Sequence, residues 1–300
     1  PGLTFDITAH GHLMPRSVIF LISDHVAATA SNDNYVRLPK AFSQCGWQVC
    51  IGDPDRLMMS AGALSVDGHR LDQADLIWPL GFGPKAGFMD RAHLLNQLPQ
   101  RRLITPMAEL LLSHGKAQWA ELCAPTHISN NPGELQQIAH QYGGDWVLKP
   151  LAGSYGRGVQ HVPVNHYPDI EQAMSAQPGV YFVLQRFVPE ILVGEIRTLV
   201  AGGEIIGSYR RSPQKDIRAN LAKGGRPMAV AEKSINKQLL NRLVAELSQR
   251  QIGYAAIDTV GDYLMEVNLA NPGGLATLTA LYERDFATQV VRAICAQKDL

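Results

Sequence analysis

Two runs of almost unbroken apolar residues constrain the fold of the first third of the chain. The segments "SVIFLIS" (17–23) and "ADLIWPL" (74–80) have the length of a strand, and continuous apolar runs of that length are typical of strands buried on both faces. A helical stretch that ends near Cys45 follows the first run, and "WQVCI" (47–51) indicates another strand. Strands that alternate with helices predict an open α/β sheet over residues 14–112.

Shorter elements complete this part of the prediction. Asp67-Gly68 lies between two short runs and indicates a hairpin. We expect a helix near 88–97, a short strand in "RRLITP" (101–106), and a helix over 114–122 that Ser113 caps.

The rest of the chain differs, because it is rich in antiparallel hairpins. We expect strands in "DWVLKP", "VQHVPV" and "VYFVLQRFV", a hairpin that turns at Gly202-Gly203, and helices over 132–142, 234–250 and about 276–297. The predicted class is therefore α/β followed by α+β. The expected parts are a possible expression remnant or disordered segment (1–13, with Met14 a candidate start), a substrate domain (14–112), a lid (113–188) and a C-terminal subdomain with a metal site (189–300).

Composition excludes several classes of protein. The chain has 300 residues, with 27 basic and 27 acidic side chains, so it lacks the positive charge of a dedicated nucleic-acid binder. No apolar run approaches the length of a membrane span and no signal peptide is recognisable. We therefore expect a cytoplasmic protein with no nucleic-acid or membrane partner. The four cysteines show no CxxC spacing and are expected to be reduced thiols.

The segment "DTVGDYLMEVN" (258–268) carries oxygen donors where strands prefer apolar residues. Alternation places Glu266 and Asn268 on one face together with Leu264. A three-residue turn over 260–262 would put Asp258 on the same face. Two carboxylates and an amide suit Mg²⁺, whereas a solvated edge strand is the simpler interpretation of the hairpin alone.

The segment "VLKPLAGSYGRGV" (147–159) combines a strand, a lysine at its end and a glycine-rich loop. Glycines let backbone amides approach phosphate oxygens, although such a loop is more often a plain flexible hairpin. Lys149 favours the phosphate site, because a lysine at the end of an apolar strand needs an anionic partner.

Six motifs in order give the chain a resemblance to the ATP-grasp superfamily, within it to bacterial glutathione synthetases and RimK-type ligases. They are Lys116 in "SHGKAQWA", "VLKPLAGSYGRGV", "VLQRFVPE", "GEIRTLVAGGEIIGSYRR", "IRANLAKGG" and "IDTVGDYLMEVN". The resemblance spans nearly all of residues 17–295. It implies ATP and Mg²⁺ (or Mn²⁺) as cofactors, small-molecule carboxylate and amine substrates, and a homodimer or homotetramer.

The resemblance also implies roles for individual residues. Lys116 and Lys149 would contact the α- and β-phosphates, and the loop of Gly153, Ser154, Tyr155, Gly156 and Gly158 would close over the triphosphate. Gln185, Arg186, Phe187 and Val188 would form the hinge that meets adenine, and Glu195 would accept hydrogen bonds from ribose. Asp258, Glu266 and Asn268 would hold one or two metal ions. Arg211 would contact the γ-phosphate or an acyl-phosphate, with Arg197, Arg218 and Asn220 along the substrate channel.

Phosphoryl transfer depends on positioning and charge neutralisation more than on an enzyme nucleophile. The expected reaction is therefore ATP-dependent amide formation through an acyl-phosphate. The part of the site that would bind the substrates departs from the family pattern in two places. The segment "WPLGFGPKAGF" has Lys85 as its only charge. The segment "LANPGGLATLTALYE" lacks the arginine that follows the metal-binding asparagine in glutathione synthetases. Glycine as amine substrate is thereby in doubt. A non-catalytic ATP-binding module and a phosphotransferase that stops at the phosphorylated product remain alternatives.

Overall fold

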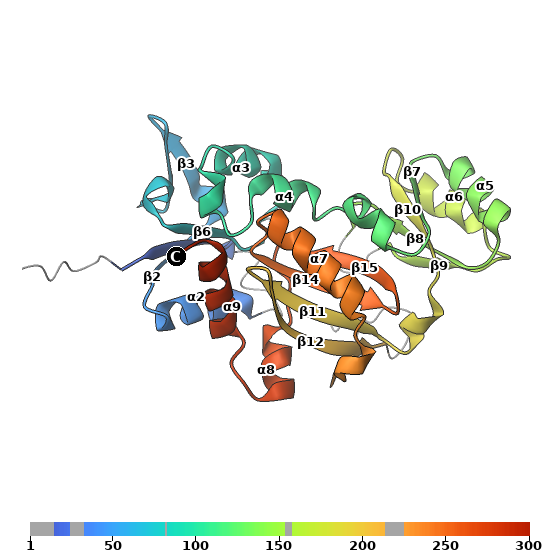
Figure 1. The fold of residues 1–300 in the computed structure, drawn as a ribbon. Helices are drawn as coiled ribbons and strands as arrows, with labels where there is room; N and C mark the ends of the chain where they lie inside the picture. The colour runs from blue at the N-terminus through green and yellow to red at the C-terminus, as the bar shows by residue number, and fades with distance from the viewer. Residues whose placement is uncertain (1–14, 25–32, 82, 154–157, 214–224) are drawn as a thin grey trace, which may run out of the picture.

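The structure, a computed structural model, describes residues 15–24, 33–81, 83–153, 158–213 and 225–300. Figure 1 shows an N-terminal α/β part at one end, the sheet of residues 126–186 at the other, and the C-terminal sheet between them. This mixture of parallel and antiparallel sheets confirms the predicted class.

The N-terminal part is built on a three-stranded parallel sheet in the order β2-β1-β6. Its strands are β1 (Ser17–Leu21), β2 (Gln48–Gly52) and β6 (Leu76–Pro79), and α2 (Asn34–Gln44) connects the first two. The two apolar runs of the sequence form β1 and β6, and every residue of β6 is buried. The predicted α/β arrangement is therefore present.

A small antiparallel sheet, β3-β4-β5, lies beside the parallel one. It contains β3 (Leu57–Ser60), β4 (Ala63–Val66) and β5 (His69–Arg70), and the last two meet at the predicted hairpin. Asp67 and Gly68 both have positive φ angles, 47° and 83°, which is the geometry of a two-residue type I′ turn.

Two predictions in this region are wrong. Residues 101–106 form no strand: Gln100–Arg102 is a 3₁₀ turn, and Leu103 makes only an isolated parallel bridge to Ile77. Ser113 caps no following helix, because it ends α4 (Met107–Leu112) and its carbonyl accepts the Trp119 indole N–H at 2.6 Å. Residues Lys116–Leu122 are 3₁₀-helical, with Gly115 at their N-cap.

One further prediction for the described chain is confirmed. The helix predicted near 88–97 is α3 (Phe88–Leu95). The remaining 3₁₀ turns are Pro54–Arg56, Leu71–Gln73, Pro189–Leu192 and Glu232–Ser234.

The sheet at the far end is antiparallel, in the order β7-β10-β8-β9. Its strands are β7 (Thr126–Ser129), β8 (Trp146–Pro150), β9 (Gln160–Val162) and β10 (Phe182–Arg186), with helices α5 (Pro132–Tyr142) and α6 (Pro168–Ser175). Trp146, Leu148 and Phe182 pack with Leu135 of α5 and Ile170 of α6 in one buried cluster. This part therefore has its own core.

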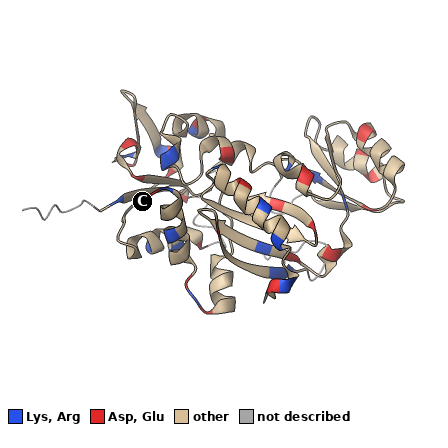
Figure 2. Ribbon diagram, in the orientation of Figure 1, with Lys and Arg blue, Asp and Glu red and all other residues tan. Residues whose placement is uncertain are grey.

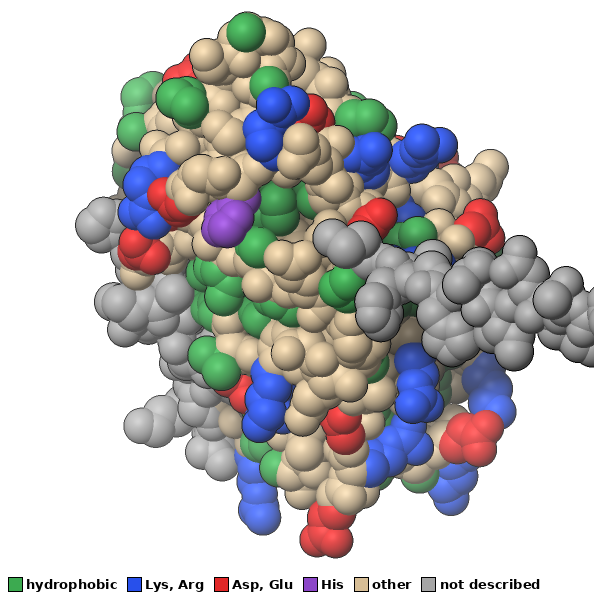
Figure 3. Space-filling view, turned by 90° about the vertical axis from the view of Figure 1, so that its left-hand side faces the viewer, with side chains coloured by type: hydrophobic (Ala, Val, Ile, Leu, Met, Phe, Trp, Pro, Cys, Tyr) green, Lys and Arg blue, Asp and Glu red, His purple; other side chains and the backbone are tan. Residues whose placement is uncertain are grey.

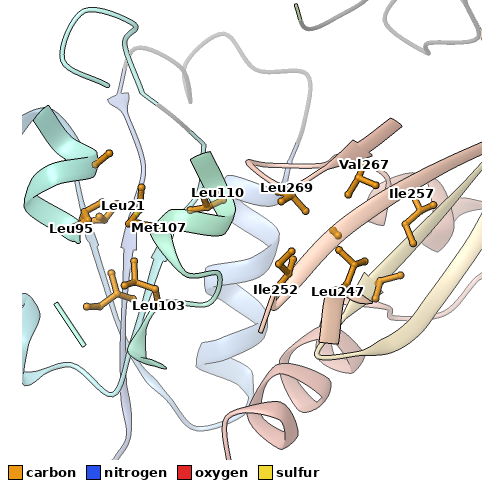
Figure 4. Close-up of a cluster of buried hydrophobic side chains, with 14 of the residues drawn as sticks. Leu21, Leu95, Leu103, Met107, Leu110, Leu247, Ile252, Ile257, Val267 and Leu269 are labelled. Atoms are coloured by element: carbon orange, nitrogen blue, oxygen red, sulfur yellow. The ribbon is translucent and has the colours of Figure 1, made fainter. Parts of the chain in front are cut away.

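The central sheet has five antiparallel strands in the order β13-β12-β11-β14-β15. They are β11 (Glu195–Ala201), β12 (Glu204–Ser212), β13 (Arg226–Ala229), β14 (Tyr254–Val260) and β15 (Tyr263–Asn268). Helix α7 (Lys237–Gln249) covers one face: Leu243 and Leu247 pack with Ile257 and Val267, and this cluster extends to Leu21 and Met107 of the N-terminal part (Figure 4).

The opposite face of the central sheet is apolar only at one end. There Leu199 and Ala256 pack with α8 (Leu275–Tyr282), α9 (Ala287–Gln297) and Phe20 of the N-terminal sheet. The single helix predicted over 276–297 is thus wrong, because Glu283 adopts a left-handed conformation (φ 51°) and the Asp285 carboxylate accepts the Ala287 N–H at 2.9 Å. Among the described residues, no helix has the length and apolarity needed to cross a membrane.

Candidate active site

The other end of that same face carries a row of charged side chains. Cross-strand partners share a face of a sheet, and the register pairs Glu195 with Arg211, Arg197 with Asp258, and Asp258 with Glu266. Charged segments accordingly lie side by side on the central sheet in Figure 2. Side chains predicted from separate motifs are therefore brought together by strand register.

The β14–β15 hairpin reaches the predicted face by a different route. Its turn has two residues, Gly261 and Asp262, instead of three, and a bulge interrupts the ladder between Asp258 and Thr259. Because the bulge leaves Met265 without a partner, Leu264 pairs with Thr259 on the α7 face while Glu266 pairs with Asp258. The expectation that Leu264 shares a face with Glu266 is wrong, but the three oxygen-bearing side chains do lie together.

Asp258 is surrounded by arginine. Its side chain is 2% exposed, and its two oxygens accept Arg197 Nε and Nη2 at 2.8 and 2.7 Å. Arg211 Nη2 lies 2.8 Å from the same carboxylate and also contacts Glu195. Burial alone would raise the pKa of Asp258, but the two guanidinium groups outweigh it and lower the pKa.

At Glu195, the effect of burial on the pKa outweighs that of the neighbouring arginine. Burial raises the pKa of its carboxyl to about 7, against the opposing attraction of Arg211. Its role in contacting ribose is not tested by the structure and stays a prediction.

Glu266 faces a lysine. Lys116 Nζ lies 3.6 Å from Glu266 Oε1, and the Glu266 side chain is 36% exposed. The same ammonium donates to the carbonyls of Gly153 at 2.8 Å and Leu151 at 3.3 Å. Lys116 therefore connects the start of the glycine-rich loop to the strand that carries Glu266.

Lys149 is held inside the lid sheet. It is 9% exposed, and its Nζ donates to Gln185 Oε1 at 3.0 Å. Gln185 Nε2 donates in turn to Thr126 Oγ1 at 2.9 Å. Burial lowers the pKa of Lys149, although Glu266 counteracts the effect. The amide thus orients the lysine, a role that the sequence does not predict.

In the predicted hinge (residues 185–188), backbone groups are more available to a bound molecule than the side chains are. Arg186 reaches away, donating to the Tyr142 carbonyl at 3.2 Å and stacking 4.1 Å above the ring of Trp146. The Phe187 N–H donates to Asp145 O. Within the described part of the chain, the Phe187 carbonyl and the Val188 N–H have no hydrogen-bond partner.

Some predicted site residues are not placed. Ser154, Tyr155, Gly156, Arg218 and Asn220 lie outside the described residues. Gly158 is described: its φ is +70° and a Cβ there would lie 3.0 Å from Pro150, so the end of the loop requires glycine.

Sequence reasoning missed residues that join the N-terminal part to the site. Asn34 Nδ2 donates to Asn271 Oδ1 at 2.9 Å and to the Pro272 carbonyl at 3.0 Å, just beyond Asn268. His114 Nδ1 accepts the Leu269 N–H at 3.3 Å. Isolated polar residues such as these have no periodic signal; only their closeness in space reveals them.

Residues 114–283 match the family model described as "Prokaryotic glutathione synthetase, ATP-grasp domain". The chain belongs to the ATP-grasp family of prokaryotic glutathione synthetases. The matched span begins at His114, just before the 3₁₀ helix of Lys116, and ends at Glu283, just after α8, so it contains every element of the charged face.

Curated relatives of this glutathione synthetase-like protein have similar sequences over part of their length. The glutathione synthetase of Prochlorococcus marinus subsp. pastoris is 29% identical over 184 residues, which are 60% of this chain and 59% of the relative. That of Agrobacterium fabrum is 26% identical over 219 residues, covering 71% and 68%. The match to the first thus spans about three fifths of that enzyme.

Solved structures share the fold over nearly the whole chain. The D-cycloserine synthetase DcsG has a TM-score of 0.68 at 15% identity, covering 94% of this chain and 99% of that one. A RimK domain ATP-grasp protein from Sphaerobacter thermophilus has a TM-score of 0.62 at 18% identity, covering 92% and 98%. At these identities the likeness concerns the fold.

Proposed function

We propose that this ATP-grasp protein is an ATP-dependent carboxylate–amine ligase. The observation that carries the proposal is the convergence of two lysines from different elements on one carboxylate strand. Lys116 lies beside Glu266, Lys149 is buried within its electrostatic reach, and Asn268 follows on the same face. Buried cations that face hard oxygen donors suit a metal-bound polyphosphate.

The nucleotide would lie between the lid sheet and the central sheet. The Val188 N–H and the Phe187 C=O, which have no partner among the described residues, match the acceptor N1 and the donor N6 of adenine. Glu195 would accept the ribose hydroxyls, while Lys116, Lys149 and the loop from Gly153 to Gly158 would hold the phosphates.

The donor set fits Mg²⁺ or Mn²⁺. Glu266 is partly exposed, and Asn268 lies within 3.5 Å of it. A carboxylate and an amide oxygen leave coordination positions for water and phosphate oxygens, and the cation would neutralise charge that develops on the transferred phosphoryl group.

The chain's own residues would position two substrates. A substrate carboxylate oxygen attacks the γ-phosphorus, the bond to the β–γ bridging oxygen breaks, and ADP leaves. The amine nitrogen then attacks the acyl-phosphate carbonyl and loses a proton as phosphate departs. Arg211 and Arg197, with Arg218 and Asn220 outside the described residues, would line the path of these anions.

The amine substrate is expected to differ from glycine. The loop after Asn268 lacks the arginine of the family pattern, and Arg197 Nη1 donates to the Gly273 carbonyl at 3.2 Å. The only charge of the loop after β6, Lys85, is exposed. Fewer cations at this end favour an amine substrate with less anionic charge than an amino acid carboxylate.

A coupled assay for ADP release tests the proposal. Candidate acids and amines should produce ADP and phosphate in equal amounts only in combination, and Glu266→Gln should lose most of that turnover while its circular dichroism spectrum is unchanged. Tight MgATP binding without turnover against a broad panel would instead support a non-catalytic module. ADP without free phosphate would support a phosphotransferase.

A further inference from the structure

Residues 269–274 join β15 to α8 and form neither helix nor strand. Their backbone is nevertheless held at several positions by residues from other parts of the fold. The hydrogen bonds run from Leu269 N–H to His114 Nδ1 at 3.3 Å, from Gly81 N–H to the Ala270 carbonyl at 3.0 Å, and from Arg197 Nη1 to the Gly273 carbonyl at 3.2 Å. The segment that follows Asn268 is therefore fixed along its length.

Asn34 holds the middle of this segment from the N-terminal part. It is the first residue of α2, and it is fully buried (0% exposed). Its Nδ2 donates to Asn271 Oδ1 at 2.9 Å and to the Pro272 carbonyl at 3.0 Å. The Tyr254 hydroxyl donates to the same carbonyl at 3.3 Å. One amide group of the N-terminal part thus contacts two successive residues of the segment.

The direction of these bonds is unusual for an asparagine at the start of a helix. Asparagine there commonly accepts a backbone N–H from the first turn of its own helix. The amide nitrogen of Asn34 has two hydrogens, and its two acceptors lie 237 and 238 positions away in the sequence. Burying an amide costs free energy unless its hydrogen bonds are made. The contacts with the segment therefore give a physical reason for a polar side chain at this buried position.

Asn268 depends on this segment for its orientation. It is the last residue of β15, where the ladder pairs it with Ala256. Its side-chain amide lies 3.3 Å from Asp258 Oδ2 and 3.5 Å from Glu266 Oε2, beside the other two predicted metal ligands. The sheet fixes the chain before Asn268, and the segment fixes the chain after it. Contacts behind the direct ligands commonly orient a metal ligand and strengthen metal binding.

We propose that Asn34 is a positioning residue for the cation site: it fixes residues 269–274 and thereby orients Asn268 toward the divalent cation that binds with the nucleotide. This inference rests on the proposed function. It gives the N-terminal part, which the sequence predicts to hold substrate, a share in building the metal site of the central sheet.

Manganese binding tests this role without any assay of turnover. Mn²⁺ is titrated into protein saturated with ADP, and free Mn²⁺ is followed by electron paramagnetic resonance. Asn34→Leu keeps a side chain of similar size but loses both hydrogen bonds, and we expect it to weaken Mn²⁺ binding about tenfold, the low end of what outer contacts of metal ligands contribute. Val36→Ala, on the same helix at a side chain that is 72% exposed, is the control. Wild-type Mn²⁺ affinity in Asn34→Leu would overturn the proposal.

Calorimetry of ADP with excess chelator separates positioning from a general loss of structure. The groups proposed to bind ADP without metal are Lys116, Lys149 and the hinge, and none of them contacts Asn34 among the described hydrogen bonds. Asn34→Leu should therefore bind metal-free ADP within about threefold of wild type. A loss of metal-free ADP affinity as large as the loss of Mn²⁺ affinity would show a merely structural role and would overturn the proposal.

Asn271→Ala approaches the same contact from the other side and keeps the test valid if Asn34→Leu does not fold. It removes one acceptor and leaves the bond to Pro272, so we expect about threefold weaker Mn²⁺ binding. The double variant should bind Mn²⁺ no more weakly than Asn34→Leu alone, because both changes act through one contact.

Two results with these variants would count against the inference alone: unchanged Mn²⁺ affinity in Asn271→Ala, or losses that multiply in the double variant. Failure of wild-type protein to bind Mn²⁺ with ADP would instead overturn the proposed function and this inference together.

Discussion

At the scale of single residues, the sequence predicted which charged side chains lie on one face better than it predicted their contacts. Lys149 stood out because a lysine at the end of an apolar strand is unusual, and it is buried. Gln185 was expected in the hinge that meets adenine mainly through backbone groups, which stays a prediction, but the contacts of its side-chain amide with Lys149 and Thr126 were not predicted. These contacts depend on which strands are neighbours, and a single strand's sequence does not contain that information.

The amide of Gln185 should therefore matter for nucleotide binding. Gln185→Leu leaves the Lys149 ammonium without its acceptor, and we expect the KM for ATP to rise about tenfold, which corresponds to ~1.4 kcal/mol. Lys149→Ala should raise it at least as much. Gln160→Leu is the control, because Gln160 is exposed on the neighbouring strand β9. Steady-state kinetics with saturating second substrates measures the effect, and equal KM values in the Gln185 and Gln160 variants would contradict it.

Glu195 should make stability depend on pH. Its folded pKa of about 7 lies above the ordinary value of 4.5, so the folded state holds its proton more tightly than the unfolded state. The stability from this group is fully present below about pH 4.5 and is lost as the pH rises through 7. Urea denaturation from pH 4.5 to 8 should therefore show a smaller decline in unfolding free energy for Glu195→Gln than for wild type. Parallel curves for the two proteins would exclude this assignment.

At the scale of elements, alternation predicted the composition of the charged face but not its construction. The bulge at Met265 places Glu266 opposite Asp258, whereas a longer turn was expected to bring the same residues together. A bulge and a longer turn each add one residue to the hairpin, and each changes by one position which side chains face each other across it. The sequence alone therefore does not distinguish them. The sequence predicted α8 and α9 as one helix for a similar reason, because a left-handed Glu283 has no distinctive sequence signal.

The β11–β12 turn should depend on a close approach to α9. A Cβ at Gly202 would lie 2.0 Å from the Ala293 carbonyl oxygen, whereas a Cβ at Gly179 meets nothing within 4 Å. Both glycines have positive φ, 53° and 80°, so alanine has a similar conformational cost at each. We expect Gly202→Ala to reduce the unfolding free energy by about 2–3 kcal/mol more than Gly179→Ala. Thermal denaturation measures both, and similar melting temperatures would mean that α9 does not pack on this turn.

At the scale of the whole molecule, the N-terminal part and the central sheet share their cores. Trp78 of β6 lies 5.6 Å from the ring of Tyr254 on β14, and Val18 and Phe20 belong to the same cluster as Val290 of α9. The Gly81 N–H donates to the Ala270 carbonyl, so the loop after β15 also touches the N-terminal sheet. The sequence predicted separate domains over 14–112, 113–188 and 189–300, and those boundaries stay a prediction.

A fragment of residues 14–112 should therefore not fold independently. It would expose the apolar surface that Tyr254, Val290 and their neighbours cover, and buried apolar area supplies most of a domain's stability. We expect a circular dichroism spectrum without cooperative thermal unfolding. A fragment with a sharp melting transition would show that the shared core is dispensable.

The surface at the N-terminal end carries exposed apolar side chains, which are relevant to whether copies of the protein associate. On the face at the left of Figure 1, hydrophobic side chains gather in the middle of the surface (Figure 3). Ile51 on the edge strand β2, with Met58 and Met59 on β3, is among the exposed apolar residues. The homodimer or homotetramer that the resemblance implies stays a prediction.

A divalent cation on the β15 side chains and the two lysines are expected to bind one nucleotide together. Isothermal titration calorimetry of ATP, with Mg²⁺ and with excess chelator, measures whether they do. We predict that Mg²⁺ tightens ATP binding in wild-type protein and that Glu266→Gln loses most of this gain. Equal affinity for ATP with and without Mg²⁺ would contradict it.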